Sequence, residues 1–205
     1  MNIYLVGFMG TGKSSVGCQL AREKGWNFID LDELIELKEQ RRIAEIFAGK
    51  GEPYFRKVEK KTLKQVSTQK GFVVACGGGV VLDKDNVSLM KKTGIMVCLS
   101  ATPEEILQRV SSNKDRPLLN VASPRKRIEL LLKMRAPYYA QANKIVDTTG
   151  LSVKQAARKI SGLFAGGKSS FPPGSKAGAR KSGPAGRGKS RRCLKRKRFS
   201  SGRHG

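Results

Sequence analysis

With 205 residues, 39% of them apolar, the chain can bury the core of one globular domain and carry an appendage. The chain has 41 Lys and Arg residues but only 16 Asp and Glu residues. Residues 166–205 contain 13 of the basic residues and none of the acidic ones, which leaves 28 basic and 16 acidic residues in 1–165, so that part is basic as well. This charge suits anionic ligands, and the sequence has neither an apolar run of about 18 residues nor a signal-peptide pattern, which argues against a membrane protein.

Short apolar segments alternate with helical patterns along the first 165 residues. The pattern predicts strands over 3–6, 27–30, 94–100 and 144–148, a strand that runs from 72 into glycines, and helices over 13–24, from 31, from 53 to about 66, and near 103–111, 124–142 and 152–163. Such alternation is typical of an α/β fold with a five-stranded parallel sheet, covered by helices on both faces in three layers. Ligands of such sheets bind beside the carboxyl ends of the strands.

The strand and helix pattern ends after Ala165. Residues 166–205 consist mainly of Gly, Ser, Pro, Lys and Arg, and they cannot bury enough apolar surface to offset the entropy of ordering. We therefore expect a domain over 1–165 followed by a disordered basic tail over 166–205. The tail could attract nucleic acid non-specifically, although Phe199 is the one aromatic residue of its most basic segment and offers little base stacking.

The segment after the first predicted strand is typical of a nucleotide-binding loop. Gly7, Gly12, Lys13 and Ser14 match the pattern G-x-x-x-x-G-K-[ST]. Glycines let the backbone wrap phosphates with its N–H groups pointing inward, and the next helix directs its N-terminus at the negative charge. We expect Lys13 to reach the β- and γ-phosphates. The residues predicted to bind the nucleotide here are Gly10, Thr11, Gly12, Lys13, Ser14 and Ser15.

A magnesium ion requires oxygen ligands, and Ser14 is the first candidate. The strand from 72 ends in glycines and offers no Asp, whereas the second predicted strand is followed by Asp30 and Asp32. Asp30 is therefore the candidate for holding Mg²⁺, directly or through water. The alternative is that Asp30 only caps the next helix.

Arg135 continues an apolar stripe. Ile128, Leu131, Leu132, Arg135 and Tyr139 recur at spacings of three or four residues, so Arg135 is expected to point inward, toward a buried anion. A carboxylate suits it, because the planar guanidinium donates two parallel hydrogen bonds. The alternative is a surface arginine whose stem covers apolar neighbours.

Three further segments have two interpretations each. Arg56 lies three residues before Glu59, which by spacing alone predicts a surface ion pair. Gly77, Gly78 and Gly79 mark either a close approach of the backbone or a flexible turn. Residues 111–124 join two helices without apolar periodicity, and we expect a mobile lid there. Its Arg116 would close onto the phosphates and stabilise charge in the transition state, unless the segment is a solvated loop.

Six segments, in this order, resemble the shikimate kinase family: GFMGTGKSSVG, FIDLDELIE, IAEIFAGKGEPYFRKVE, CGGGVV, DRPLL and MRAPYY. The resemblance covers residues 1–163 and implies a P-loop kinase fold related to that of the nucleoside monophosphate kinases. It also implies ATP as co-substrate, one Mg²⁺ ion per subunit, and phosphorylation of the 3-hydroxyl of shikimate, in the synthesis of chorismate and aromatic amino acids.

The resemblance implies roles for the acceptor-site residues as well. Arg56 and Arg135 would grip the carboxylate of shikimate, Glu59 would orient Arg56, and the loop 77–79 would bound the ring. Asp32 would bind the ring hydroxyls and act as general base or as a positioning group. The residues expected to be catalytic are Lys13, Asp32 and Arg116.

Some alternatives stay open. Family members often have an arginine near the last strand that stacks on adenine, whereas this sequence has Thr149, Gly150 and Leu151 there, so the packing of adenine is not predicted. Gluconate kinase, whose acceptor is also a hydroxylated acid, is the nearest alternative enzyme, and nucleic-acid binding through the tail is the alternative from another class.

We expect a cytoplasmic monomer without membrane or specific nucleic-acid partners. The cysteines Cys18, Cys76, Cys98 and Cys193 show neither metal-binding spacing nor a dense disulfide pattern, which favours free thiols in a reducing compartment.

Overall fold

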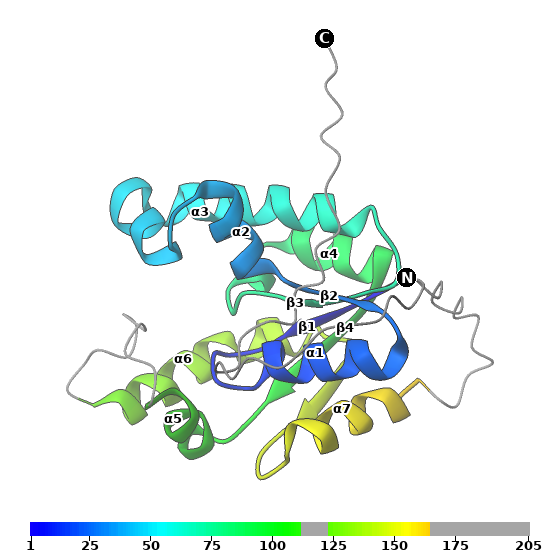
Figure 1. Ribbon diagram of the computed structural model, residues 1–205. Coiled ribbons are helices and arrows are strands. Elements are labelled where there is room, and N and C mark those ends of the chain that lie inside the picture. The colour runs from blue at the N-terminus through cyan, green and yellow to red at the C-terminus, as the bar shows by residue number, and fades with distance from the viewer. Residues whose placement is uncertain (112–122, 165–205) are drawn as a thin grey trace, which may run out of the picture. The chain divides into compact units, whose positions relative to one another are not determined.

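The computed structural model describes residues 1–111 and 123–164 (Figure 1). Five strands form one sheet in the order β2-β3-β1-β4-β5, and all neighbouring strands are parallel. The predicted α/β fold with a five-stranded parallel sheet is therefore confirmed. The strands are β1 (Asn2–Val6), β2 (Asn27–Asp30), β3 (Phe72–Ala75), β4 (Gly94–Ser100) and β5 (Lys144–Asp147).

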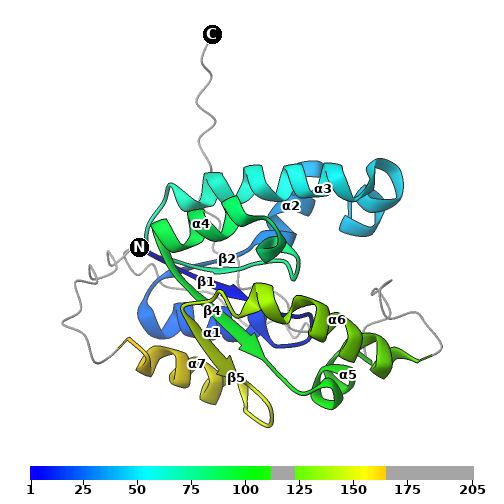
Figure 2. The same cartoon turned by 180° about the vertical axis from the view of Figure 1, so that it is seen from behind.

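Helices cover both faces of this sheet, as the sequence predicts (Figures 1 and 2). Helices α1 and α7 pack on one face, and the buried residues of α2 to α6 form the core on the other. The helices are α1 (Lys13–Lys24), α2 (Leu31–Glu39), α3 (Ile43–Ser67), α4 (Lys84–Thr93), α5 (Pro103–Ser111), α6 (Pro124–Tyr139) and α7 (Val153–Gly162), with a 3₁₀ turn η1 (Val80–Leu82) before α4.

The central strand β1 belongs to both cores. Ile3 and Leu5 pack with α1 and α7, whereas Tyr4 and Val6 pack with the helices of the opposite face. Successive side chains of a strand point to opposite faces, so a strand covered on both sides is apolar nearly throughout. This arrangement buries β1 and places the loop that follows it at the middle of the sheet.

Helix α3 is longer than predicted. The expected helix from Pro53 is present, but it is preceded by a helical segment that begins at Ile43. The two parts meet at Gly51, whose φ of 75° and ψ of 170° are not helical. A glycine followed closely by a proline is typical of such a break, because each disfavours a continuous helix.

Helix α4 is absent from the sequence prediction. The side chain of Asp83 caps it by accepting a 2.8 Å hydrogen bond from the N–H of Asp85, and Val87 and Met90 are buried. Two apolar residues three positions apart are too short a pattern to distinguish a helix from a loop.

The cysteine expectation is confirmed in part. Cys76 and Cys98 are buried free thiols. Along 1–111 and 123–164, no helix combines the length and the apolar character needed to cross a membrane.

The strand order brings three loops together. The carboxyl ends of β2, β3 and β1 are adjacent because these strands neighbour one another in the sheet. Asp30 is the last residue of β2, the glycines 77–79 come shortly after β3, and the loop 7–12 follows β1. The candidate residues from three distant parts of the sequence therefore lie at one edge.

Candidate active site

The loop between β1 and α1 has the backbone that close contact with phosphate requires. Gly7, Gly10 and Gly12 have φ values of 131°, 77° and 92°, in the region that glycine enters without strain. Gly12 begins α1, and no side chain caps this end of the helix. An uncapped helix N-terminus presents backbone N–H groups and a partial positive charge to an anion.

Lys13 is folded over the same loop. Its Nζ donates hydrogen bonds of 2.9 Å to the carbonyl oxygens of Gly7 and Phe8. The ammonium group is thereby held above the loop by backbone oxygens rather than extended into solvent. A lysine in this position adds a full positive charge to the partial charges of the N–H groups.

Asp30 has two roles at once. Its Oδ1 accepts from the backbone N–H groups of Asp32 and Glu33, at 3.1 and 3.5 Å, and so caps α2. Its Oδ2 accepts a hydrogen bond of 2.5 Å from the hydroxyl of Ser14. Asp30 therefore caps the helix, as the alternative interpretation has it, through one oxygen. Its other oxygen lies beside the phosphate loop, where a magnesium ligand is expected.

The pair formed by Ser14 and Asp30 suits magnesium chemically, because Mg²⁺ prefers hydroxyl and carboxylate oxygens. Among residues 1–111 and 123–164, no cluster of three or more His, Cys, Asp or Glu could hold a metal ion. Mg²⁺ commonly uses one or two protein ligands and completes its shell with water and substrate phosphates.

The glycines 77–79 contact the side chains that are expected to bind the acceptor. A Cβ atom built on Gly77 would lie 2.8 Å from Oδ1 of Asp32 and 2.9 Å from Oε1 of Glu59, closer than real Cβ contacts. The backbone must therefore carry no side chain at this position. Of the two interpretations of this loop, close approach is the one that the packing supports.

The next two glycines contact arginines. A Cβ atom on Gly78 would lie 3.5 Å from Nη1 of Arg135, and one on Gly79 would overlap the guanidinium of Arg56. Two guanidinium groups and two carboxylates from the three helices α2, α3 and α6 thus surround three consecutive glycines. The residues expected to bind the acceptor, apart from any in the lid, are brought together here.

Arg56 and Glu59 form an ion pair that is largely removed from solvent. Nη1 of Arg56 lies 2.7 Å from Oε2 of Glu59, whose side chain is only 1% exposed. Arg56 also pairs with Glu52 at 2.9 Å. Burial acts to lower the pKa of Arg56, but the two glutamates outweigh it and raise that pKa. The surface ion pair predicted by spacing alone is wrong, because Glu59 faces the core.

The side chain of Asp32 is short of partners. Its Oδ1, like Oε1 of Glu59, is buried without a hydrogen bond. Burial, and then the negative charges of Asp30 and Glu59, raise the pKa of Asp32 to about 7. Burial also raises the pKa of Glu59, against the attraction of Arg56. Unsatisfied buried carboxyl oxygens cost free energy, and a ligand with hydroxyl groups could satisfy them.

Arg135 is half-buried and points inward from α6. Its guanidinium lies over the ring of Phe8, 5.8 Å from the centroid, as well as beside Gly78. This confirms the expectation from the apolar stripe, since a surface arginine would not face the phosphate loop.

Two expected features lie outside the described residues: Arg116, and nearly all of the predicted lid over 111–124. The helices on either side, α5 and α6, end and begin close to the predicted lid boundaries.

Arg109 is a site residue that sequence reasoning missed. Its Nη1 donates to the carbonyl oxygen of Gly10, at 3.3 Å, and its Nη2 to that of Thr148, at 2.9 Å. It also pairs with Glu105 at 2.8 Å, four residues earlier on α5. That spacing predicts a surface ion pair, and nothing local to α5 signals the contacts with the phosphate loop and the loop after β5.

Residues 149–151, where family members often have an arginine that stacks on adenine, belong to a tight turn. Thr149 donates both its N–H and its hydroxyl to Asp147, and Thr148 is buried with its hydroxyl on the carbonyl oxygens of Thr11 and Ser100. Arg109 reaches this turn from α5. An arginine is therefore present on this side of the phosphate loop, although it comes from a different element than the resemblance implies.

A parallel sheet with a glycine-rich phosphate loop at the end of its central strand, and a pocket of paired charges beside it, defines a P-loop phosphotransferase of small molecules. Comparison with protein families gives the particular family: the model for shikimate kinase matches residues 9–163. The shikimate kinase of Caldanaerobacter subterraneus subsp. tengcongensis is 45% identical over 159 residues, which cover 78% of this chain and 93% of that protein. The chain belongs to the shikimate kinase family.

Other relatives agree. The shikimate kinase of Thermodesulfovibrio yellowstonii is 44% identical over 159 residues, or 78% of this chain and 92% of that protein. Among solved structures, shikimate kinase from Acinetobacter baumannii in complex with shikimate has a TM-score of 0.76 and 40% identity, covering 79% of this chain and 91% of that one. Shikimate kinase from Aquifex aeolicus has a TM-score of 0.70 and 34% identity, with 82% and 100% covered.

The raised pKa of Asp32 predicts how the stability of the ligand-free protein depends on pH. Its folded pKa of about 7 exceeds its ordinary value of 3.8, so the protonated carboxyl favours folding, and this contribution is lost as the pH rises through 7. Asp32→Asn should therefore show little stability difference from the parent near pH 4. At pH 8 it should be more stable, by about 2 to 4 kcal/mol.

Urea unfolding of the metal-free protein between pH 4 and pH 8 measures this difference. Glu23→Gln, at an exposed carboxylate on α1, controls for the loss of a negative charge in general. A stability difference for Asp32→Asn that stays constant over this range would contradict the burial argument.

Proposed function

We propose that this protein transfers the γ-phosphate of ATP to the 3-hydroxyl of shikimate, giving shikimate 3-phosphate and ADP. The observation that carries the proposal is the convergence of Arg56, Arg135 and Asp32 on the loop 77–79, beside the phosphate loop. A Cβ atom on Gly78 would lie 3.6 Å from the Gly7 carbonyl oxygen, to which Lys13 donates. Donor and acceptor would thus meet at Gly7 and Gly78.

The acceptor half of the site matches the chemistry of a hydroxylated carboxylic acid. Arg56 and Arg135 would bind the carboxylate, and Glu59 would hold the guanidinium of Arg56 in place. Asp32, with a buried oxygen that lacks a partner, would accept hydrogen bonds from ring hydroxyls. With its pKa near 7, Asp32 could also accept the proton of the attacking hydroxyl.

The donor half would hold the β- and γ-phosphates of ATP. The backbone N–H groups of residues 10–15 and the ammonium of Lys13 would neutralise the phosphates, and Arg116 would add positive charge from the lid as it closes. Phosphoryl transfer depends mainly on alignment and on stabilising charge spread over the transferred group. Arg109 would contribute on the adenine side, where the usual arginine after the last strand is replaced by Thr149.

Magnesium would be held by Ser14 and Asp30, with water and phosphate oxygens as its other ligands. When bound, the ion would neutralise charge on the β- and γ-phosphates. Asp30 would offer the ion Oδ2, which accepts from Ser14 in this structure, while its Oδ1 caps α2.

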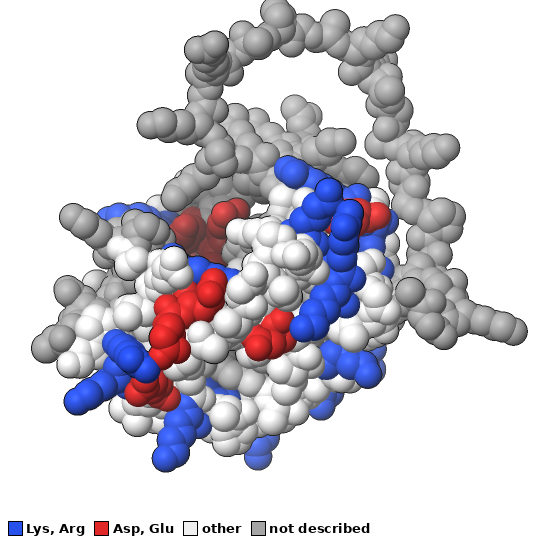
Figure 3. Space-filling view, turned by 90° about the horizontal axis from the view of Figure 1, so that it is seen from below, with Lys and Arg blue, Asp and Glu red and all other residues white. Residues whose placement is uncertain are grey.

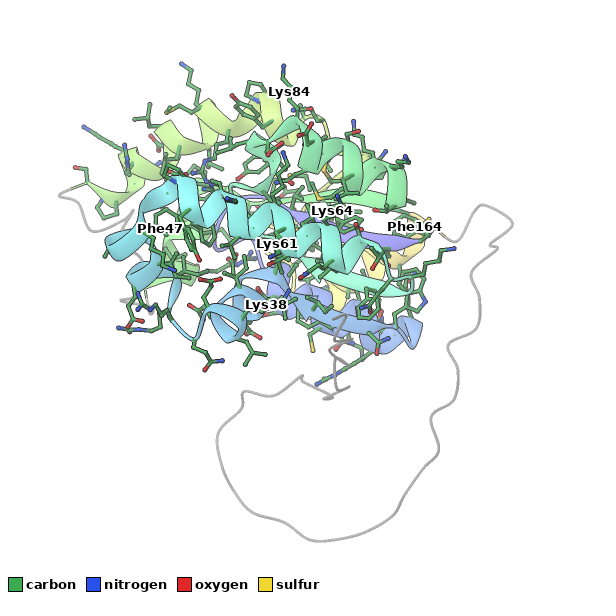
Figure 4. The ribbon with its side chains drawn as sticks, turned by 90° about the horizontal axis from the view of Figure 1, so that it is seen from above. Lys38, Phe47, Lys61, Lys64, Lys84 and Phe164 are labelled. Atoms are coloured by element: carbon green, nitrogen blue, oxygen red, sulfur yellow. The ribbon has the colours of Figure 1, made fainter. Side chains whose placement is uncertain are left out.

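Gluconate kinase activity is not favoured, since the relatives at this level of identity are shikimate kinases. The other alternative, nucleic-acid binding through the tail, rests on residues outside the described ranges. On the face drawn in Figure 3, Lys and Arg side chains are interspersed with Asp and Glu. Figure 4 shows Lys61 and Lys64 on the outer surface of α3, where both are exposed and neither adds charge to the site.

We further propose that residues 1–165 form the catalytic domain and 166–205 a tail that is dispensable for phosphoryl transfer. The buried free thiols Cys76 and Cys98 support a cytoplasmic protein. The site needs no residue from a second copy in this arrangement, which supports a catalytic unit of one chain.

The direct test is release of ADP with shikimate as acceptor. With ATP and Mg²⁺, we expect ADP release to depend on shikimate and to exceed that with gluconate by at least about tenfold, since an acceptor of the wrong shape misaligns its hydroxyl. ADP release that does not rise above the rate without acceptor would overturn the proposal.

Substitution of Arg135 tests the acceptor half. Arg135→Ala should raise the KM for shikimate by roughly 10- to 150-fold, because a charged hydrogen bond contributes about 1.5–3 kcal/mol, and should leave the KM for ATP nearly unchanged. Lys133→Ala, an exposed cation on the same helix, is the matched control. Equal damage to both KM values would remove the role assigned to Arg135.

Two substitutions of Asp30 separate its cap from its magnesium role. Asn caps helices about as well as Asp, so Asp30→Asn should keep the parent's stability but require about tenfold more Mg²⁺ for half-maximal activity. Asp30→Ala should show the same magnesium defect and also lose about 1 kcal/mol of stability. Activity titrated with Mg²⁺ and urea unfolding give the two readouts; an unchanged Mg²⁺ requirement in Asp30→Asn would refute the ligand role.

A further inference from the structure

The hydroxyl of Tyr139 lies between two components of the acceptor site. Tyr139 is the last residue of α6 and is 8% exposed. It follows Arg135 by four residues, so both side chains project from the same face of the helix. Its ring packs in the core formed by α2 to α6, whereas its hydroxyl reaches the loop 77–79.

The hydroxyl has two polar neighbours. It donates a hydrogen bond of 2.8 Å to the carbonyl oxygen of Gly78. The guanidinium of Arg135 is its other polar neighbour; a Cβ atom built on Gly78 would lie 3.5 Å from Nη1 of Arg135 and 3.7 Å from the Tyr139 hydroxyl. Burial raises the pKa of Tyr139 to about 12, while the charge of Arg135 and hydrogen bonding from it oppose this rise. The phenol therefore stays neutral near pH 7 and keeps the proton that it donates.

Together with Phe8, this hydroxyl borders the guanidinium of Arg135. The ring of Phe8 lies under the guanidinium, and the hydroxyl of Tyr139 lies beside it. An arginine side chain has many rotamers, and contacts that hold it in one of them before the ligand arrives reduce the entropy lost on binding. The same hydroxyl ties Gly78 to α6, and thus fixes the spacing between loop and cation.

We propose that Tyr139 is a positioning residue, which holds Arg135 and the Gly78 backbone in the geometry that binds the carboxylate of the acceptor. The inference rests on the proposed function, because the acceptor is the ligand whose binding it improves. Tyr139 acts through Arg135 and is assigned no contact with the substrate. Its neighbour Tyr138 is 38% exposed and takes no part in this arrangement.

Tyr139→Phe, made in the full chain, removes the hydroxyl and keeps the ring. The KM for shikimate should rise about 5- to 20-fold, in line with the loss of one buried hydrogen bond and of the order it imposes. The KM for ATP should stay within about twofold, since no contact of Tyr139 reaches the phosphate loop residues that would bind ATP. Tyr138→Phe deletes the same atom one residue earlier and should leave both constants at the parent values.

A double-mutant cycle tests whether Tyr139 acts through Arg135. Once Arg135→Ala has removed the guanidinium, adding Tyr139→Phe should raise the KM for shikimate by less than about twofold, because the two sites are coupled. A full additional rise in the double variant would overturn the positioning role. So would an unchanged KM for shikimate in Tyr139→Phe, or an equal rise in both KM values, which would indicate a general structural defect.

The failure of this inference is distinguishable from failure of the proposed function. If the parent protein shows no shikimate-dependent release of ADP, the substrate assignment is wrong. If the parent is active and Tyr139→Phe matches it in both constants, the substrate assignment stands and the role of Tyr139 does not. Urea unfolding of Tyr139→Phe measures its stability against that of the parent, and so shows whether a partly unfolded population contributes to a change in KM.

Discussion

Close approach of backbone to charged side chains at residues 77–79 is the constraint on which the acceptor site depends. Each of these glycines lies against a different polar group, and a Cβ atom at Gly77 or Gly79 would occupy space that a carboxylate or a guanidinium already fills. Without side chains on this loop, groups from α2, α3 and α6 can meet over a stretch of three residues. The loop lies centrally because it follows β3, and β3 lies between β2, which leads to Asp32, and β1, which leads to the phosphate loop.

The charges that meet there are unevenly matched. Arg56 is neutralised by Glu59 and Glu52, whereas one carboxyl oxygen of Asp32 and one of Glu59 are buried without hydrogen bonds. Such groups cost stability in the ligand-free protein, because burial removes water that is not replaced. Sites that bind and transform polar ligands commonly carry this cost, and a ligand that supplies the missing hydrogen bonds gains binding energy from it. A hydroxylated carboxylic acid supplies both hydroxyl donors for Asp32 and an anion for Arg135.

The parallel sheet explains how donor and acceptor come to face one another. Parallel strands direct all their carboxyl ends to one edge, and the order β2-β3-β1 places Asp30, the loop 77–79 and the phosphate loop in succession along it. Gly7 and Gly78 lie close together, and Lys13 and Tyr139 each donate a hydrogen bond to the carbonyl oxygen of one of them. The backbone at the junction is therefore held from both sides, as in-line transfer between two bound molecules requires.

The sequence by itself determined what depends on neighbouring residues: the alternation that predicts a parallel α/β sheet, the phosphate loop with Lys13 and Ser14, and the inward direction of Arg135 on its apolar stripe. It could not decide the burial of Glu59, the second hydrogen bond of Asp30, or the contacts of Arg109 and Tyr139. Spacing along a helix gives the face on which a side chain lies, but not what other segment covers that face. Those contacts join residues that are between 16 and 99 positions apart, and the strand order of the sheet brings them together only in the tertiary structure.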